Sequence, residues 1–212
     1  MTEPEIPSAH SSTSSFKNDP AKLRVLERIL REAQRTGALS TVPVSEIISH
    51  AQWFTKAIPA TAHLAVDLGS GAGVPGLIVA IQRPDLELVL VDRRASRTDN
   101  LLRAVIALNL ADRVSVRCCE IEDMARDSTW AKHLDVVMSR GLGPAVKTLN
   151  LSRELVKQRG VIIVSEPPPG NPSRWDAQQV SALGLEGPIV LGAVAMFHVK
   201  HSDAQNDRFS AS

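Results

Sequence analysis

Residues 67–76 carry acidic and glycine residues whose types and spacing suit a nucleotide-binding turn. Asp67 closes a short apolar run and is followed by glycines at alternate positions, Gly69, Gly71 and Gly73, with Gly76 after two more residues. A backbone without Cβ atoms can turn sharply and approach a ligand closely. The amides at the start of a following helix would point at the same ligand. The sequence therefore predicts a nucleotide-type site at this turn.

Two kinds of nucleotide are compatible with the turn. The dinucleotide spacing is present in Gly71-x-Gly73-x-x-Gly76, and Asp92 lies 19 residues after Gly73, where a ribose-binding acid is expected. An acid at the strand tip does not suit a pyrophosphate, whereas it suits the sulfonium and ammonium groups of S-adenosylmethionine. The residues favour S-adenosylmethionine over a nicotinamide dinucleotide. No Gly-Lys-Ser/Thr sequence follows the turn, which excludes a P-loop, and no metal site is expected.

The elements that would position these residues alternate between strand and helix from Leu64 onward. Such alternation requires a mostly parallel, doubly wound α/β sheet with helices on both faces. Ligands bind outside the carboxyl ends of its strands, so Asp67, Asp92 and Ser139–Arg140 should share one rim. The predicted strands are 64–68, 86–92, 113–119, 134–139, 160–165, 189–191 and 195–199. The predicted helices are 21–36, 44–58, one ending before residue 83, 96–109, 144–157 and 177–183.

The composition suits one globular domain. Hydrophobic residues make up 43% of the 212 residues, but aromatic residues only 3%, so the core must be aliphatic. A net charge of +1 excludes a protein-wide polycation and leaves room for a local basic face. The adjacent Cys118 and Cys119 suit neither a disulfide nor a zinc site, and we expect buried thiols in a reducing compartment.

The N-terminus shows no secretory leader, and no apolar run is long enough to span a bilayer, so we expect a cytoplasmic protein. Two helices precede the first strand and form an N-terminal helical layer. The expected division is a disordered tail (1–20), N-terminal helices (21–63), an S-adenosylmethionine-binding methyltransferase domain (64–201) and a frayed C-terminal tail (202–212).

Further motifs accompany the glycine turn in a fixed order. The turn ends Val74-Pro75-Gly76, Arg83-Pro84 precedes the second strand, Glu122-Asp123 follows the third, and Ser139-Arg140 ends the fourth. Together with Asp92 they resemble the RsmG (GidB) family of bacterial 16S ribosomal RNA guanine-N7 methyltransferases, over residues 45–200. The resemblance implies a class I methyltransferase (Rossmann-like) fold with a seven-stranded sheet.

The resemblance also implies roles for individual residues. Asp92 would bind the ribose hydroxyls, Ile121 and Glu122 would flank the adenine, and Ser139 and Arg140 would take part in catalysis. The alternatives are a helix N-cap for Asp92 and a surface ion pair for Arg140. The implied S-adenosylmethionine site comprises Asp67, Gly69, Ser70, Gly71, Gly73, Val74, Asp92, Ile121, Glu122 and Arg140.

The substrate half departs from the family pattern. A family lysine at the end of the fifth strand is replaced here by Ser165-Glu166. The implied partner is 16S ribosomal RNA or the small ribosomal subunit, bound by a monomer without membrane contact. The alternatives are a methyltransferase for a small molecule or another RNA, and a cofactor-binding protein with weakened catalysis. Local evidence for RNA is an arginine cluster formed by residues 93, 94, 97, 103, 113 and 117, which can equally be a solvated surface.

Overall fold

The structure is a computed structural model that describes residues 19–167, 170 and 173–200. The expected disordered tail (1–20) lies outside the described residues up to residue 18, but Asp19 and Pro20 begin α2, so the predicted tail is two residues too long. The expected C-terminal tail (202–212) also lies outside the described residues. No helix in the described ranges is long and apolar enough to cross a bilayer. The elements are α2 (Pro20–Arg35), α3 (Val44–Ala57), β1 (Leu64–Leu68), α4 (Gly76–Gln82), β2 (Glu87–Asp92), α5 (Ala95–Ala107), β3 (Val114–Cys118), α6 (Ile121–Arg126), β4 (Leu134–Ser139), α7 (Ala145–Leu155), β5 (Val156–Ser165), α8 (Ala177–Ala182), β6 (Leu185–Leu191) and β7 (Val194–Val199).

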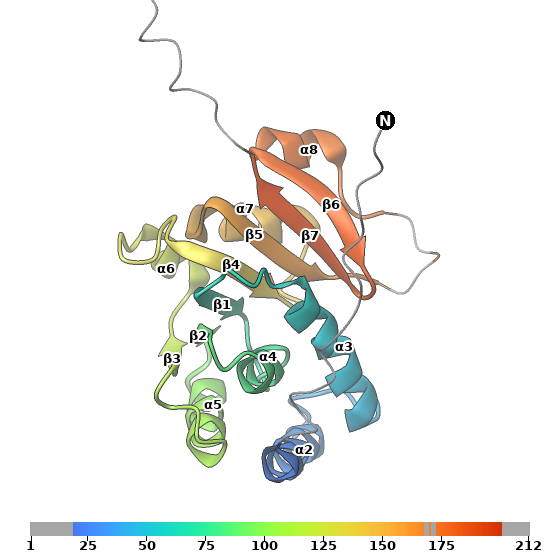
Figure 1. The fold of residues 1–212 in the computed structure, drawn as a ribbon, viewed down its shortest axis with the longest axis vertical. Helices are drawn as coiled ribbons and strands as arrows, with labels where there is room; N and C mark the ends of the chain where they lie inside the picture. Colours follow the sequence, from blue (N-terminus) through green and yellow to red (C-terminus); the bar gives the residue numbers. More distant parts are fainter. Residues whose placement is uncertain (1–18, 168–169, 171–172, 201–212) are drawn as a thin grey trace, which may run out of the picture.

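One seven-stranded sheet runs through the molecule in the order β3-β2-β1-β4-β5-β7-β6 (Figure 1). The strands β1 to β5 are parallel to one another. The last strand, β7, lies between β5 and β6 and is antiparallel to both. The order reverses between β1 and β4, where ligands bind in doubly wound sheets. The predicted fold class is confirmed.

The sheet separates two apolar cores. One core lies under α2 to α5 and includes Phe54, Leu77 and Leu101; the other includes Met124, Leu149 and Phe197. Since successive residues of a strand point to opposite faces, each buried strand contributes to both cores. Runs such as Leu88–Val91 are therefore apolar at every position.

The N-terminal helices form a layer over one face of the sheet (Figure 1). Helix α2 begins at Pro20, and the side chain of Asp19 caps it by accepting a hydrogen bond from the Lys22 amide. Leu26 and Leu30 are its buried residues, one turn apart. Helix α3 packs against α4 and against β7. The layer therefore belongs to the same core as the strands that carry the glycine turn.

Three elements differ from the sequence prediction, each for a local reason. Helix α6 has six residues, too few for a helical period to be recognised. Strand β5 begins at Val156 rather than at residue 160, because a bulge separates its pairing with Leu134 from its pairing with Val136. Strand β6 begins at Leu185 although it contains Gly187 and Pro188, which are tolerated because it is the edge strand.

Candidate active site

The glycine turn leaves β1 in left-handed conformations. Gly71 has φ +55° and Gly73 has φ +87°. A Cβ on Gly73 would lie 2.4 Å from Leu77 Cδ1, and one on Gly71 would lie 2.8 Å from Arg97 Nη1. At Gly73 a side chain would collide with the packed Leu77, whereas at Gly71 the flexible Arg97 could move and the left-handed backbone alone disfavours a side chain.

Asp67 stabilises this turn from inside. Its carboxylate is 1% exposed, and Oδ2 accepts a hydrogen bond of 3.0 Å from the Gly76 amide at the start of α4. Burial raises the pKa of Asp67 to about 7, against the opposing effects of that hydrogen bond, of Ser70 and of the Arg140 charge. The carboxylate thus binds the backbone of its own turn, and direct contact between Asp67 and a cofactor stays a prediction.

Ser70 joins the turn to the neighbouring strand. Its Oγ donates to the Asp67 carbonyl at 2.8 Å and accepts from the Val91 amide at 3.1 Å, while the Ser70 amide donates to the Val91 carbonyl at 2.9 Å. The residue is 2% exposed. Ser70 therefore fixes the distance between the ends of β1 and β2.

Asp92 ends β2 and faces the turn. Its Oδ2 accepts from the Gly71 amide at 3.0 Å and its Oδ1 accepts from the Arg94 amide at 3.0 Å. The N-cap of α5 is Arg94, so the alternative of Asp92 as a helix N-cap is wrong. Each carboxylate oxygen keeps a lone pair for another donor. Asp92 is therefore held in place by two amides and remains able to bind hydroxyl groups.

A cleft of about 310 Å³ opens at this rim of the sheet. Four of the predicted cofactor residues line it: Gly69, Asp92, Ile121 and Glu122. The other predicted residues, Asp67, Ser70, Gly71, Gly73, Val74 and Arg140, do not line this cleft, and the first five of them form the turn behind it. The sequence did not assign the other lining residues to this site. Arg93, Arg94 and Arg97 belong to the predicted arginine cluster and Cys119 to the predicted core, and nothing pointed to Glu120, Leu142, Lys147 and Leu151.

Some of these residues lie on α7 or on the loop before it, far along the chain from the turn. Lys147 forms an ion pair of 3.2 Å with Glu122. A hydrogen bond from the Glu122 backbone amide and the interaction with Lys147 lower the pKa of the Glu122 carboxyl. The lysine lies one residue after Val146 in an ordinary amphipathic helix, and its type and spacing carry no signal of a site. Only the packing of α7 beside α6 reveals it.

The end of β4 carries polar groups without protein partners. Ser139 is 0% exposed, and its Oγ has no hydrogen-bond partner among the described residues. Arg140 is half-buried, and burial lowers its pKa while the nearby Asp67 carboxylate opposes that shift. No ion pair joins Arg140 to the part of the chain that is described, so the alternative of a surface ion pair is not supported.

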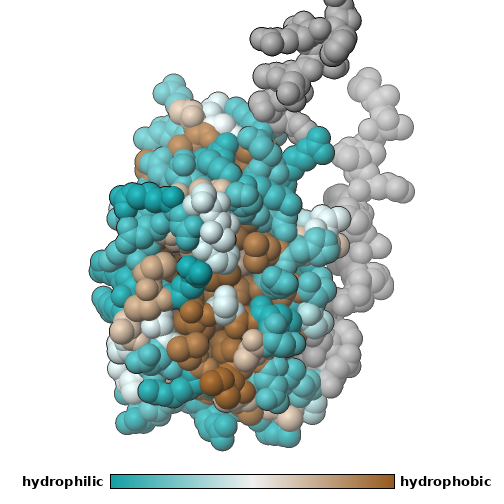
Figure 2. All heavy atoms as spheres, turned by 90° about the vertical axis from the view of Figure 1, so that its left-hand side faces the viewer, coloured by the Kyte–Doolittle hydropathy of each residue, from teal (hydrophilic) through white to brown (hydrophobic). Residues whose placement is uncertain are grey.

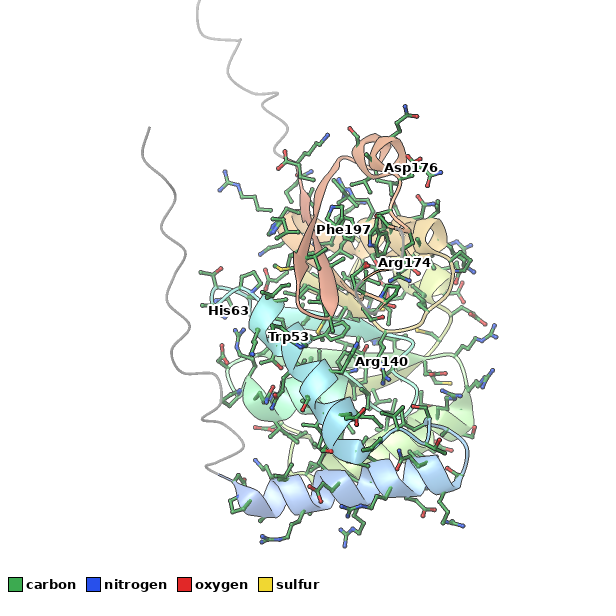
Figure 3. The ribbon with its side chains drawn as sticks, turned by 90° about the vertical axis from the view of Figure 1, so that its right-hand side faces the viewer. Trp53, His63, Arg140, Arg174, Asp176 and Phe197 are labelled. Carbon is green, nitrogen blue, oxygen red and sulfur yellow. The ribbon has the colours of Figure 1, made fainter. Side chains whose placement is uncertain are left out.

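His50 of α3 lies near Arg140, on the face of the sheet that the N-terminal helices cover. Its Nδ1 is buried without a partner in the described ranges. Burial, and next the charge of Arg140, lower the pKa of His50. Figure 3 shows Arg140 beside α3, with Arg174 between it and Asp176. Two buried polar atoms near this rim, His50 Nδ1 and Ser139 Oγ, thus lack a partner among the described residues. They lie on opposite faces of the sheet, because Ser139 pairs in register with Leu68 and Val164 of the core that faces away from α3.

Glu166, directly after β5, has a structural role. It accepts a hydrogen bond from Trp175 Nε1, and its Oε1 lies 3.8 Å from Arg174 Nε. The Arg174 guanidinium lies 4.4 Å from the Trp175 ring centre. Glu166 therefore joins the end of β5 to the segment before α8.

Predictions about three residues are wrong. Cys118 is exposed and Cys119 is only partly buried on the wall of the cleft, because β3 is the edge strand and its end is uncovered. Arg113 is not part of a basic surface. It donates to the backbone carbonyls of Arg83 and Leu86 at 3.2 Å and so connects the ends of α4 and β2 to β3.

Comparison with known proteins identifies the family. The GidB family, described as "rRNA small subunit methyltransferase G", matches residues 28–166. The chain belongs to this family. The resemblance to the RsmG (GidB) family is confirmed. The matched residues include the turn, both walls of the cleft and the end of β4.

Relatives in the family cover the central part of the chain. The ribosomal RNA small subunit methyltransferase G of Nocardioides sp. is 37% identical over 129 residues, which is 61% of this chain and 47% of that protein. The protein of that name from Salinispora arenicola is 44% identical over 92 residues, 42% of this chain and 38% of that protein. The matched part of the chain thus spans about half the length of these relatives or less.

Solved structures agree in fold. The O-methyltransferase from Bacillus cereus, in complex with SAH, superposes with a TM-score of 0.58 at 12% identity and covers 90% of this chain and 98% of that one. An O-methyltransferase family protein from Burkholderia thailandensis gives 0.56 at 19% identity, with 94% and 65% covered. At such identities the likeness shows the class I methyltransferase fold alone.

Proposed function

We propose that this protein is an S-adenosylmethionine-dependent methyltransferase whose acceptor is guanine N7 of small-subunit (16S) ribosomal RNA. Membership of the family supports the acceptor. The observation that carries the cofactor is Asp92, which two amides hold at the wall of a cleft beside Gly69. A fixed carboxylate at the end of the second strand of a doubly wound sheet suits vicinal ribose hydroxyls.

The residues of the cleft fit the chemistry of this cofactor. Asp92 would accept hydrogen bonds from the ribose, and Ile121 and Leu142 offer apolar surface for a purine ring. The absence of a Cβ at Gly69 lets Leu142 pack closely against the turn, because a Cβ there would lie 2.9 Å from Leu142 Cδ1. When bound, S-adenosylmethionine supplies an electrophilic methyl group on its sulfonium.

The chain contributes alignment rather than proton transfer. Guanine N7 carries a free lone pair, so no general base is required, and the main task of the protein is to fix donor and acceptor and to exclude water. Arg140 and Ser139, at the end of β4 next to β1, would donate hydrogen bonds to the acceptor base or to the cofactor carboxylate. The Ser139 hydroxyl has no partner and Arg140 has no ion pair in the described chain, which is consistent with this role.

Cofactor titration tests the first half of the proposal. Isothermal titration with S-adenosylmethionine should give binding, and titration with NAD should give none. The reverse result would overturn the assignment of the cofactor.

Transfer of labelled methyl to isolated small subunits tests the second half. Subunits from a strain that lacks this methyltransferase should accept methyl at guanine, whereas subunits from the parent strain should not. If the subunits take up no methyl although the cofactor still binds, the RNA assignment is wrong. The acceptor is then a small molecule, or the protein binds the cofactor without catalysis. Light scattering should give a monomer, and cell fractionation should find the protein in the cytoplasm.

A further inference from the structure

A second hollow lies on the outside of the glycine turn. It is a groove of about 890 Å³ between α2 and α5. Apolar side chains form its floor, namely Ile29, Ala33, Ala38, Leu101, Ala104 and Ala107. On the outer side of α5, Leu102 and Ile106 are 46% and 66% exposed, and Figure 2 shows a large apolar area on this side of the molecule, bordered by hydrophilic residues. The groove itself therefore has an apolar floor, and α5 carries a second exposed apolar face on its other side.

Arginines border the groove on both sides. Arg28, Arg31 and Arg35 stand at positions i, i+3 and i+7 of α2 and thus on one face, spread over about 10 Å of helix at 1.5 Å per residue. Arg97 and Arg103 stand opposite them on α5. Glu32 is the one acidic residue of the lining. The border is strongly cationic although the whole protein is nearly neutral.

The pairing of these arginines within the protein is weak. Arg31 lies 2.9 Å from Glu27 and Arg35 lies 2.6 Å from Glu32, both within α2 and both with exposed guanidiniums. Such surface pairs contribute about 0–1 kcal/mol, so a phosphate can replace the carboxylate at small cost. Arg28 and Arg97 form no ion pair with any residue in the described ranges.

The groove leads to the proposed cofactor site. Gly71 and Ala72 of the turn form one end of it, and Arg97 lines both the groove and the cleft. The Arg97 guanidinium lies directly against Gly71. A polymer in the groove would therefore be held on the outer side of the turn whose inner side faces the cleft.

We propose that this groove binds an unpaired strand of the RNA substrate, with nucleobase and ribose faces on the apolar floor and phosphates on the arginine border. The proposal rests on the proposed function, because it assumes an RNA acceptor. An unpaired strand fits better than a duplex, since a duplex turns its phosphates outward and hides the faces of its bases. Arginines also stack on bases, which a strand with exposed bases permits.

Binding of a short labelled 16S oligoribonucleotide, single-stranded or annealed to its complement, tests the proposal by fluorescence anisotropy in the presence of S-adenosylhomocysteine. The double variant Arg28→Ala/Arg103→Ala should bind the single strand about tenfold more weakly, as expected when two solvent-exposed charge contacts are lost. The slope of log K against log salt should fall by about 0.7 for each phosphate contact removed. Wild type should prefer the single strand to the duplex.

Two further variants separate the groove from general charge effects. Arg126→Ala removes an arginine of α6 that is likewise exposed and paired three residues away, and it should leave RNA affinity unchanged. Ala107→Glu places a carboxylate at an exposed position of the floor and should weaken binding as the double variant does. Circular dichroism and S-adenosylhomocysteine affinity should match wild type in every variant.

The failure of this inference differs from the failure of the proposed function. If wild type and the double variant bind RNA equally well while wild type still methylates small subunits, the groove does not bind RNA and the proposed function stands. A protein partner would then be the occupant of the groove. Tighter binding of duplex than of single strand would overturn the choice of an unpaired strand. A wild type that methylates no small subunit would overturn the proposed function.

Discussion

The ends of β1 and β2 and the end of β4 lie on one rim but treat their polar groups differently. At the first, the side chains of Asp67, Ser70 and Asp92 all bind backbone groups at 2.8–3.1 Å. At the second, Ser139 Oγ is buried and Arg140 is half-buried. Within the described residues, Ser139 Oγ has no hydrogen-bond partner and Arg140 has no ion pair. A buried polar group that lacks a partner costs about 1–3 kcal/mol, so it persists where something other than stability requires it.

The difference indicates a division of labour. The turn is complete without a ligand, because its carboxylates and hydroxyl fix the backbone that a cofactor would meet. The end of β4 is incomplete without one. Four experiments test this contrast, from the largest expected effect to the smallest.

Replacing Asp67 by Asn should remove a pH dependence of stability. The folded protein holds a proton on Asp67 up to about pH 7, whereas the unfolded chain releases it near the ordinary value of 3.8. Between these values the unfolded state binds fewer protons, so wild type loses about 1.4 kcal/mol of stability per pH unit as pH rises, on the order of 4 kcal/mol in all. The Asn variant should lack this loss.

Urea denaturation of both proteins from pH 4 to pH 8 measures the difference, in which other titrating groups cancel. The free energy of unfolding of the variant, relative to that of wild type, should increase up to pH 7 and stay constant above it. A constant difference across the range would show that Asp67 stays ionised inside the turn.

Gly73→Ala should destabilise the turn by about 3 kcal/mol, because it combines a left-handed backbone with a collision against Leu77. Gly37→Ala is the matched control. Gly37 has a similar φ of +71° but no atom within 4 Å of the added Cβ, so only backbone strain of about 1 kcal/mol is expected. Thermal unfolding of both variants gives the comparison, and equal losses would mean that the turn relaxes to admit a side chain.

Asp92→Ala should weaken S-adenosylmethionine binding by about 1–3 kcal/mol if its carboxylate holds the ribose through charge-assisted hydrogen bonds. Calorimetric titration measures the affinity. Asp99→Ala, at an exposed position of α5, should leave it unchanged. An unaltered affinity in the Asp92 variant would mean that the carboxylate only holds the backbone through its two hydrogen bonds and does not bind the ribose.

The serines at the two strand ends give the most direct test of the contrast. Ser70→Ala loses two buried hydrogen bonds and should cost about 1–2 kcal/mol of stability. Ser139→Ala removes a buried hydroxyl without a partner, so the stability of the free protein should be unchanged or slightly higher. Methyl transfer by the Ser139 variant should nevertheless fall, with cofactor affinity kept. Full activity would mean that the hydroxyl meets no acceptor.

The sequence predicted the strands and the turn because their signals are local. Apolar runs closed by an acid, and glycines at alternate positions, need no knowledge of distant residues to be recognised. Lys147 and Leu151 on the cleft wall, and the arginines of α2 beside those of α5, could not be found in this way. Their positions depend on which helix faces are brought together, and in the sequence they resemble any amphipathic surface.

Residues whose contacts come from distant parts of the chain could not be interpreted from the sequence pattern either. Glu166 reads as the loss of a lysine, whereas in the fold it meets Trp175 and Arg174 from a later segment. Cys118 reads as a core residue of a strand, whereas the strand lies at the edge of the sheet. The exposure of Cys118 depends on strand order, and the contacts of Glu166 depend on how a later segment folds back; a single sequence states neither.

The position of β7 between β5 and β6 has a consequence for synthesis on the ribosome. Strand β6 (Leu185–Leu191) emerges first, yet it contacts the sheet only through β7 (Val194–Val199). Until Val199 has left the exit tunnel, β5 keeps an unpaired edge and the nascent chain exposes the apolar surface that Phe197 later covers. The half of the protein that carries the glycine turn can therefore form early, while the opposite half must wait for the last strand and is the part for which a chaperone would be most useful.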